Sequence, residues 1–104
     1  MNDKLRDTPY AREIATARLQ VMPGDEGRIE RLEMKETGET EIRFSWWKDG
    51  KMVPRPLDLP EQAFLELFRR AFDADVFSAR FQLELLRLLI GTPSFKADAA
   101  VGGP

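Results

Sequence analysis

The stretch Ser45–Val53, SWWKDGKMV, is the most informative part of this sequence. Its Asp-Gly pair suits the two positive φ angles of a type I′ turn, and alternating strand formers flank the pair on both sides. The stretch therefore predicts a tight β-hairpin in which Lys48 faces Lys51. In the same register the ladder has four further pairs: Trp47 with Met52, Trp46 with Val53, Phe44 with Arg55 and Ile42 with Leu57.

This register gives the hairpin two faces, because successive side chains of a strand point to opposite sides. One face is apolar and carries Ile42, Phe44, Trp46, Val53 and Leu57. The other face is mixed and carries Arg43, Ser45, Trp47 and Met52 with Pro54 and Pro56. The hairpin joins a third strand, residues 41–48, to a fourth strand, residues 51–57. Both prolines lie in the fourth strand at positions whose N–H would not bond to the third strand, so the fourth strand is predicted to be an edge strand.

Upstream of the hairpin the sequence predicts two more strands. Residues 14–22 alternate apolar and polar side chains, as a half-buried strand does, although their alanines and arginines leave a helix over residues 8–20 as a competing interpretation. The turn sequence Pro-Gly-Asp-Glu-Gly then leads into a strand over residues 28–36. Its apolar positions change parity once, which predicts a β-bulge near Glu30 and Arg31.

Beyond the fourth strand, predicted over residues 51–57, the apolar residues follow a helical period. The segment 58–61 has an Asp and a Glu at capping-box spacing and predicts a helix that runs to about residue 72. Ser78 can cap a second helix over residues 79–90.

This second helix is apolar over most of its circumference, with a polar ridge made by Arg80, Glu84 and Arg87. Such a helix is either buried on several sides or shared with a partner subunit. We therefore predict a homodimer whose interface contains Phe81, Leu85, Leu86, Leu88 and Leu89.

Together these elements predict one α+β domain at residues 13–92. It is a four-stranded antiparallel meander followed by two C-terminal helices packed on one face. A length of 104 residues suits a single domain with one core. Residues 1–12 are predicted to form a flexible leader and the Gly- and Ala-rich residues 93–104 a disordered tail.

The sequence contains no cysteine and no histidine. It therefore lacks thiolate ligands, disulfides and the residue that most often serves as a general base or a transition-metal ligand. The carboxylate pairs Asp73 with Asp75 and Asp25 with Glu26 do not have the ligand spacing of a calcium loop. We predict a chain that is not an enzyme and has no metal site and no cofactor.

The first residues are polar, and no apolar run later in the chain reaches the roughly 18–20 residues of a membrane helix. The sequence therefore predicts a soluble, cytoplasmic protein that does not associate with a membrane.

The hairpin is the place where charge and aromatic side chains suggest a binding surface. The chain carries a net charge of -2, so attraction to nucleic acid would have to come from a local patch. Basic side chains around a tryptophan can follow a phosphate backbone while bases stack on the ring. The predicted nucleic-acid-binding residues are Arg43, Trp47, Lys48, Lys51 and Arg55.

Four strands followed by a helix, joined by the segment Leu57–Gln62, LDLPEQ, resemble the layout of positive-cofactor-four-type transcriptional coactivators. The resemblance covers roughly residues 14–72. Members of that family bind single-stranded DNA on a curved basic sheet and dimerise through the helical side. The resemblance thus implies a DNA surface on the hairpin residues and a dimer interface that includes Phe81, Leu85 and Leu88.

Two functions stay open at this point. One is a non-enzymatic module that binds single-stranded DNA or RNA, as a transcriptional cofactor does. The other is a homodimeric protein-interaction or assembly module that binds no nucleic acid, in which the apolar helices engage a protein partner and the hairpin is structural.

Overall fold

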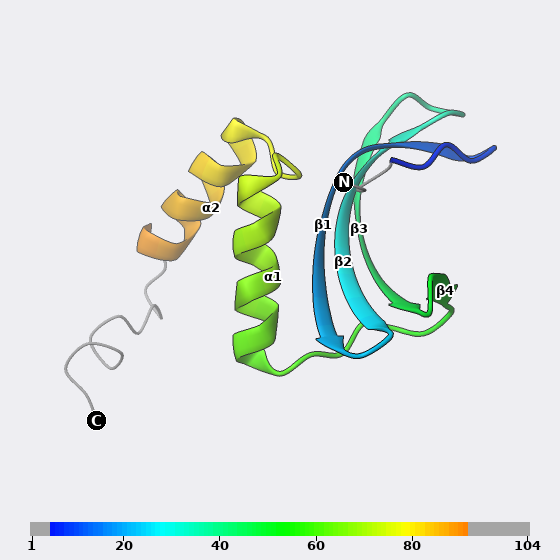
Figure 1. The fold of residues 1–104 in the computed structure, drawn as a ribbon. Coiled ribbons are helices and arrows are strands. Elements are labelled where there is room, and N and C mark those ends of the chain that lie inside the picture. The colour runs from blue at the N-terminus through cyan, green and yellow to red at the C-terminus, as the bar shows by residue number, and fades with distance from the viewer. Residues whose placement is uncertain (1–4, 92–104) are drawn as a thin grey trace.

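The computed structural model describes residues 5–91 and confirms the predicted fold class. Four strands form an antiparallel sheet in the order β1-β2-β3-β4, and two helices follow them (Figure 1). The strands are β1 (Ala11–Met22), β2 (Asp25–Met34), β3 (Thr40–Lys48) and β4 (Lys51–Val53), and the helices are α1 (Glu61–Asp73) and α2 (Ala79–Gly91). The predicted disordered tail, residues 93–104, lies outside the described residues.

Next to its turn, the hairpin forms in the predicted register. Asp49 and Gly50 have φ angles of 48° and 82°, as a type I′ turn requires, and Lys48 pairs with Lys51. Trp47 also pairs with Met52, and Trp46 with Val53.

The ladder then stops, so the predicted pairs of Phe44 with Arg55 and Ile42 with Leu57 are wrong. The N–H of Arg55 donates to the carbonyl oxygen of Val53 at 2.8 Å, which bends the chain out of the sheet. Leu57 packs instead on the hydrophobic core. Within the described chain, β3 residues 40–45 therefore have a neighbouring strand on the β2 side alone.

The first strand is confirmed, and the competing helix over residues 8–20 is wrong. The predicted bulge at Glu30 and Arg31 is also wrong, because β2 pairs with β3 without a register shift. One irregularity lies instead in β1, where Ile14 is the extra residue between the paired residues Glu13 and Ala15. The parity change in β2 has another cause, since Ile29 and Leu32 are buried on opposite faces of the sheet.

Residues 5–12, predicted as part of a flexible leader, are corrected to a segment bound to the sheet. Ala11 and Arg12 belong to β1. The N–H of Arg6 donates to Oε1 of Glu13 at 3.1 Å, and the N–H of Glu13 donates to the carbonyl of Arg6 at 2.8 Å. The hydroxyl of Thr8 accepts from the N–H of Ala11 and closes a turn, not a helix.

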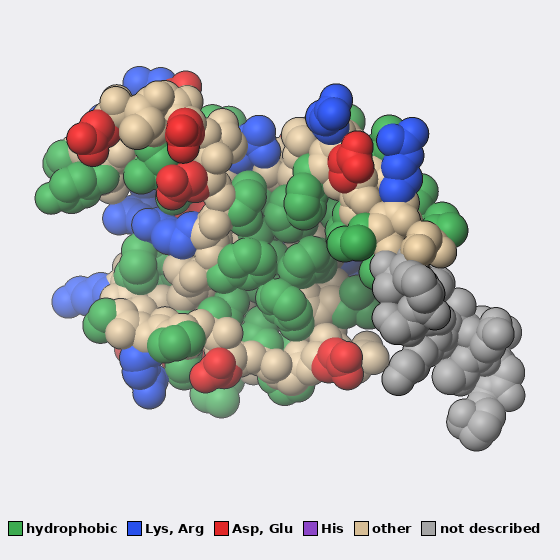
Figure 2. All heavy atoms as spheres, turned by 180° about the vertical axis from the view of Figure 1, so that it is seen from behind, with side chains coloured by type: hydrophobic (Ala, Val, Ile, Leu, Met, Phe, Trp, Pro, Cys, Tyr) green, Lys and Arg blue, Asp and Glu red, His purple; other side chains and the backbone are tan. Residues whose placement is uncertain are grey.

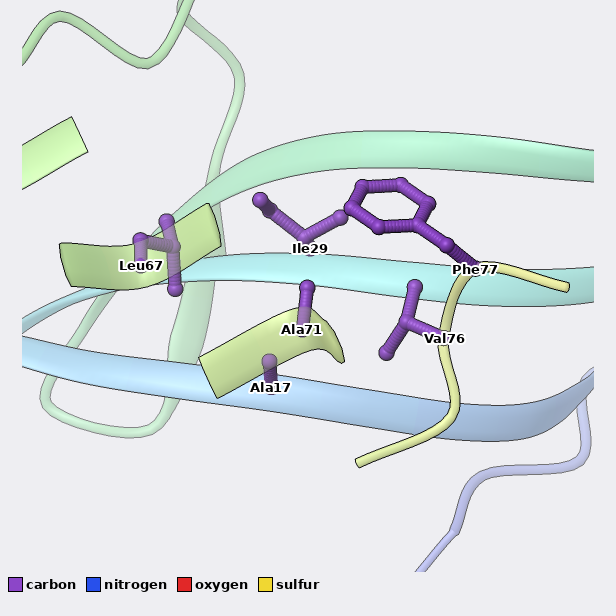
Figure 3. Packing of buried hydrophobic residues seen from close by; sticks show 6 residues of the cluster. All are labelled: Ala17, Ile29, Leu67, Ala71, Val76 and Phe77. Carbon is purple, nitrogen blue, oxygen red and sulfur yellow. The ribbon is translucent and has the colours of Figure 1, made fainter. Parts of the chain in front are cut away.

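The hydrophobic core lies between α1 and the two strands β1 and β2 (Figure 3). Its members come from all three elements and from the link to α2: Ala17, Ile29, Leu67, Ala71, Val76 and Phe77. Gly27 lets the side chains of Leu57 and Leu67 pack closely on the backbone of β2, because a Cβ there would lie 3.2 Å from Leu57 and 3.4 Å from Leu67. The predicted capping box is wrong, since α1 begins after Pro60 without a side-chain cap.

The second helix is capped as predicted, with the N–H of Phe81 donating to the Ser78 hydroxyl at 3.1 Å. Its place in the fold differs from that of α1. It lies on the side of α1 that faces away from the sheet, and none of its residues is buried (Figure 1). The ring of Phe81 contacts that of Phe77 at a centroid distance of 5.0 Å, which joins α2 to the core.

Candidate interaction surfaces

The sheet face opposite the helices carries a buried polar network centred on Glu30, which is fully buried. Arg43 donates two hydrogen bonds to its carboxylate, at 2.8 and 3.0 Å. The Ser45 hydroxyl donates to Glu30 at 2.9 Å and accepts from the Trp47 indole N–H at 2.8 Å. These hydrogen bonds satisfy a charge that would otherwise be costly to bury.

A second carboxyl group, Glu13, belongs to the same network and is 3 % exposed. Burial, and then the hydrogen bond and charge of Glu30, raise the pKa of Glu13 to about 7. Burial alone would raise the pKa of Glu30 as well, but its bonds with Arg43, Glu13 and Ser45 hold it at about 2. When Glu13 is ionised, its buried Oε2 has no hydrogen-bond partner. A proton on Glu13 that is donated to Glu30 resolves this, so the pair holds one proton at pH values below the Glu13 pKa of about 7.

Trp47 lies in this network with 5 % of its surface exposed. The guanidinium carbons of Arg28 and Arg6 lie 3.8 and 4.8 Å from its ring centroid. Arg28 is held in turn by Glu26 at 2.6 Å. Stacking of a base on this ring would therefore require the arginines to move away from it.

The structure separates the five residues predicted to bind nucleic acid. Arg43 is bonded to Glu30, and Trp47 is covered. Arg55 lies on the opposite side of the sheet, 4.7 Å from the ring of Trp46. Lys48 and Lys51 remain together at the exposed tip of the hairpin, with Lys48 3.7 Å from Asp25.

On the helix side of the sheet, phenylalanine rings form a continuous chain from β3 to α2. Phe44 contacts Phe64 and Phe68 at centroid distances of 5.8 and 6.2 Å. The chain continues through Phe68, Phe72, Phe77 and Phe81. Hydrophobic side chains accordingly gather in the middle of the face drawn in Figure 2.

The series of phenylalanine rings is open to solvent at its β3 end. Phe44 is 43 % exposed and Phe64 38 % exposed. Beside them is a hollow of about 480 Å³ lined by Glu61, Gln62, Phe64, Leu65 and Phe68. We call Phe44, Phe64 and Phe68, with this hollow, the aromatic groove.

The predicted dimer residues on α2 fall on two sides of the helix. Phe81 contacts Phe77, and Leu85 is half-buried, so these two face the rest of the chain. Leu86, Leu88 and Leu89 have exposed fractions of 53 %, 63 % and 46 %. Leu83 and Ile90 are exposed too and share a stripe with Leu86. We call Leu83, Leu86 and Ile90 the outer stripe.

Among residues 5–91, no three acidic side chains are grouped so that they could hold a metal ion. No helix in that range is both long and apolar enough to cross a bilayer.

Sequence reasoning missed both the carboxyl pair and the aromatic groove. The alternation that places Glu13 with Ala15 and Ala17 is broken at Ile14, so Glu13 turns to the face of Glu30. The sequence holds no signal for that bulge. The groove could have been found, because Phe44 was predicted to lie on the apolar face of the hairpin, and Phe64 has the helical spacing from Phe68 that puts both on one side of α1.

No family model matches the chain, and neither a curated protein nor a solved structure matches it. The resemblance to the coactivator family therefore stays a prediction. The class that the fold itself defines is an α+β domain made of a four-stranded antiparallel meander followed by two helices.

Proposed function

We propose that this chain is a non-enzymatic assembly module that forms a homodimer through α2. The observation that carries the proposal is the exposed apolar surface of that helix, on which the outer stripe residues are 47 %, 53 % and 67 % exposed. Fully burying one such side chain contributes about 1.5–3 kcal/mol of free energy. A side chain that is half exposed in a single copy can therefore gain roughly half of that free energy when a partner covers it.

A second copy is the partner because in a two-fold dimer each copy makes the same contacts, so the exposed helices of both copies are covered at once. α2 offers apolar side chains along its whole length, and its few charges form a narrow ridge. Contact with a second copy can bury the apolar side of this helix and leave the polar ridge in water.

The test is light scattering across a range of concentrations on the wild type and on Leu86→Asp. The wild type should be a dimer and the variant a monomer with an unchanged circular dichroism spectrum, because Leu86 is exposed and supports no core contact. Glu84→Gln, on the polar ridge, is the matched control and should remain a dimer. A wild type that is monomeric at every concentration would disprove the proposal.

A second candidate function, binding of single-stranded nucleic acid, is supported by one observation. Lys48 and Lys51 lie opposite each other at the hairpin tip, and Lys48 has 64 % of its side chain exposed. The double variant Lys48→Glu with Lys51→Glu should abolish binding of a labelled oligothymidine at low salt. Equal anisotropy curves for wild type and variant would remove the hairpin tip as the site.

A further inference from the structure

A four-stranded sheet needs more than one helix to cover one face. Neighbouring strands lie about 4.8 Å apart and a helix is about 10 Å across, so one helix covers about two strands. Here α1 lies over β1 and β2. The helix side of β3 is left with the half-exposed ring of Phe44 beside that of Phe64. The aromatic groove is therefore the place where a second helix would complete the layer.

A helix that fits this place is present in the same chain. α2 and α1 both have 13 residues, or about 20 Å, so α2 can run the length of the groove. Its outer stripe offers aliphatic side chains to the exposed rings. The charges are complementary, since α1 has one more acid than base and α2 one more base than acid.

The chain's own α2 is directed elsewhere. It begins directly after Val76 and Phe77, which are fixed in the core, and lies beyond α1 as seen from the sheet (Figure 1). The helix that reaches the groove must then come from another molecule.

We propose that α2 of a second copy lies in the aromatic groove, with Leu83, Leu86 and Ile90 against Phe44, Phe64 and Phe68. This rests on the homodimer proposed above and states where its helix binds. Under two-fold symmetry the exchange is reciprocal, so both grooves are filled and both outer stripes are covered at once.

Disulfide cross-linking tests this placement, because the natural chain has no cysteine. One protein carries Leu86→Cys, and a second, of different length through a tag, carries Phe64→Cys. A disulfide forms only when the two Cα atoms come within about 7 Å. Mixed and oxidised, the pair should give several-fold more cross-linked heterodimer than the control pair of Glu84→Cys with Phe64→Cys. Light scattering on the same variants, reduced, checks that each still dimerises.

The outcomes separate the two proposals. A dimer that gives no more cross-link than the control disproves the groove and leaves the homodimer standing. Monomers at every concentration disprove both. A third protein carries Leu86→Cys and Phe64→Cys in the same chain. If its monomer closes a disulfide within one chain, α2 docks on its own groove, which also overturns the exchange.

Discussion

Replacing Glu13 by glutamine should remove most of the pH dependence of stability between about pH 5 and pH 8. The pKa of Glu13 is about 7 in the folded chain and 4.5 without the fold. A group whose pKa is raised by folding stabilises fully below the unfolded value, and that contribution is lost as the pH rises through the folded value. One proton is worth about 1.4 kcal/mol per pH unit, so the wild type should lose about 2–3 kcal/mol between pH 5 and pH 8.

Few other groups disturb this measurement. The chain has no histidine, and the pKa of Glu30, which is held at about 2, affects stability only below the range tested. The amide introduced by Glu13→Gln would keep both existing contacts, because its oxygen can accept from the N–H of Arg6 and its NH₂ can donate to Glu30.

The assay is urea unfolding followed by circular dichroism at intervals across that pH range. The wild-type unfolding free energy should fall as the pH rises, while that of Glu13→Gln stays nearly level. Parallel curves for the two proteins would show that Glu13 is not the titrating group. A wild type that gains stability toward pH 8 would contradict the sign of the pKa shift itself.

Three further substitutions test the packing by their urea midpoints at neutral pH. Leu67→Ala should cost about 3 kcal/mol, because the side chain is fully buried in the core; a loss below about 1 kcal/mol would mean that the site collapses or is not core. Arg43→Ala should cost about 3 kcal/mol by leaving the Glu30 carboxylate buried without its bidentate partner, and Arg43→Lys should recover only part of it. Gly24→Ala should cost about 1–2 kcal/mol, since φ is +84° and the new Cβ would lie 2.6 Å from an Asp49 oxygen; an unchanged midpoint would show that the turn adjusts freely.

The parts of the fold that follow from local chemistry could be predicted. The Asp-Gly turn fixes the hairpin, because Asp49 and Gly50 adopt positive φ together. Ser78 caps α2 because its hydroxyl lies where a free N–H needs an acceptor. These features depend on residues that are neighbours in the sequence, so one sequence is enough to predict them.

The carboxyl pair depends on a different kind of information. A polar residue at every second position is typical of a solvent-exposed face, so the alternation of Glu26, Arg28 and Glu30 gives no indication that Glu30 is buried. Glu30 is buried among Arg43, Ser45 and Glu13, and the one-residue shift at Ile14 brings Glu13 to that face. Such contacts appear only when distant segments are placed in space.

The early end of β4 has a consequence for handling the protein. Because the ladder stops at Val53, residues 40–45 of β3 leave a row of backbone groups along a free border of the sheet. Such a border is a template on which strands of other molecules can add. The exposed Glu41 places a charge on this border, which opposes such addition. Glu41→Gln, which leaves the bond between Arg43 and Glu30 intact, would be expected to aggregate on storage before it shows any loss of thermal stability.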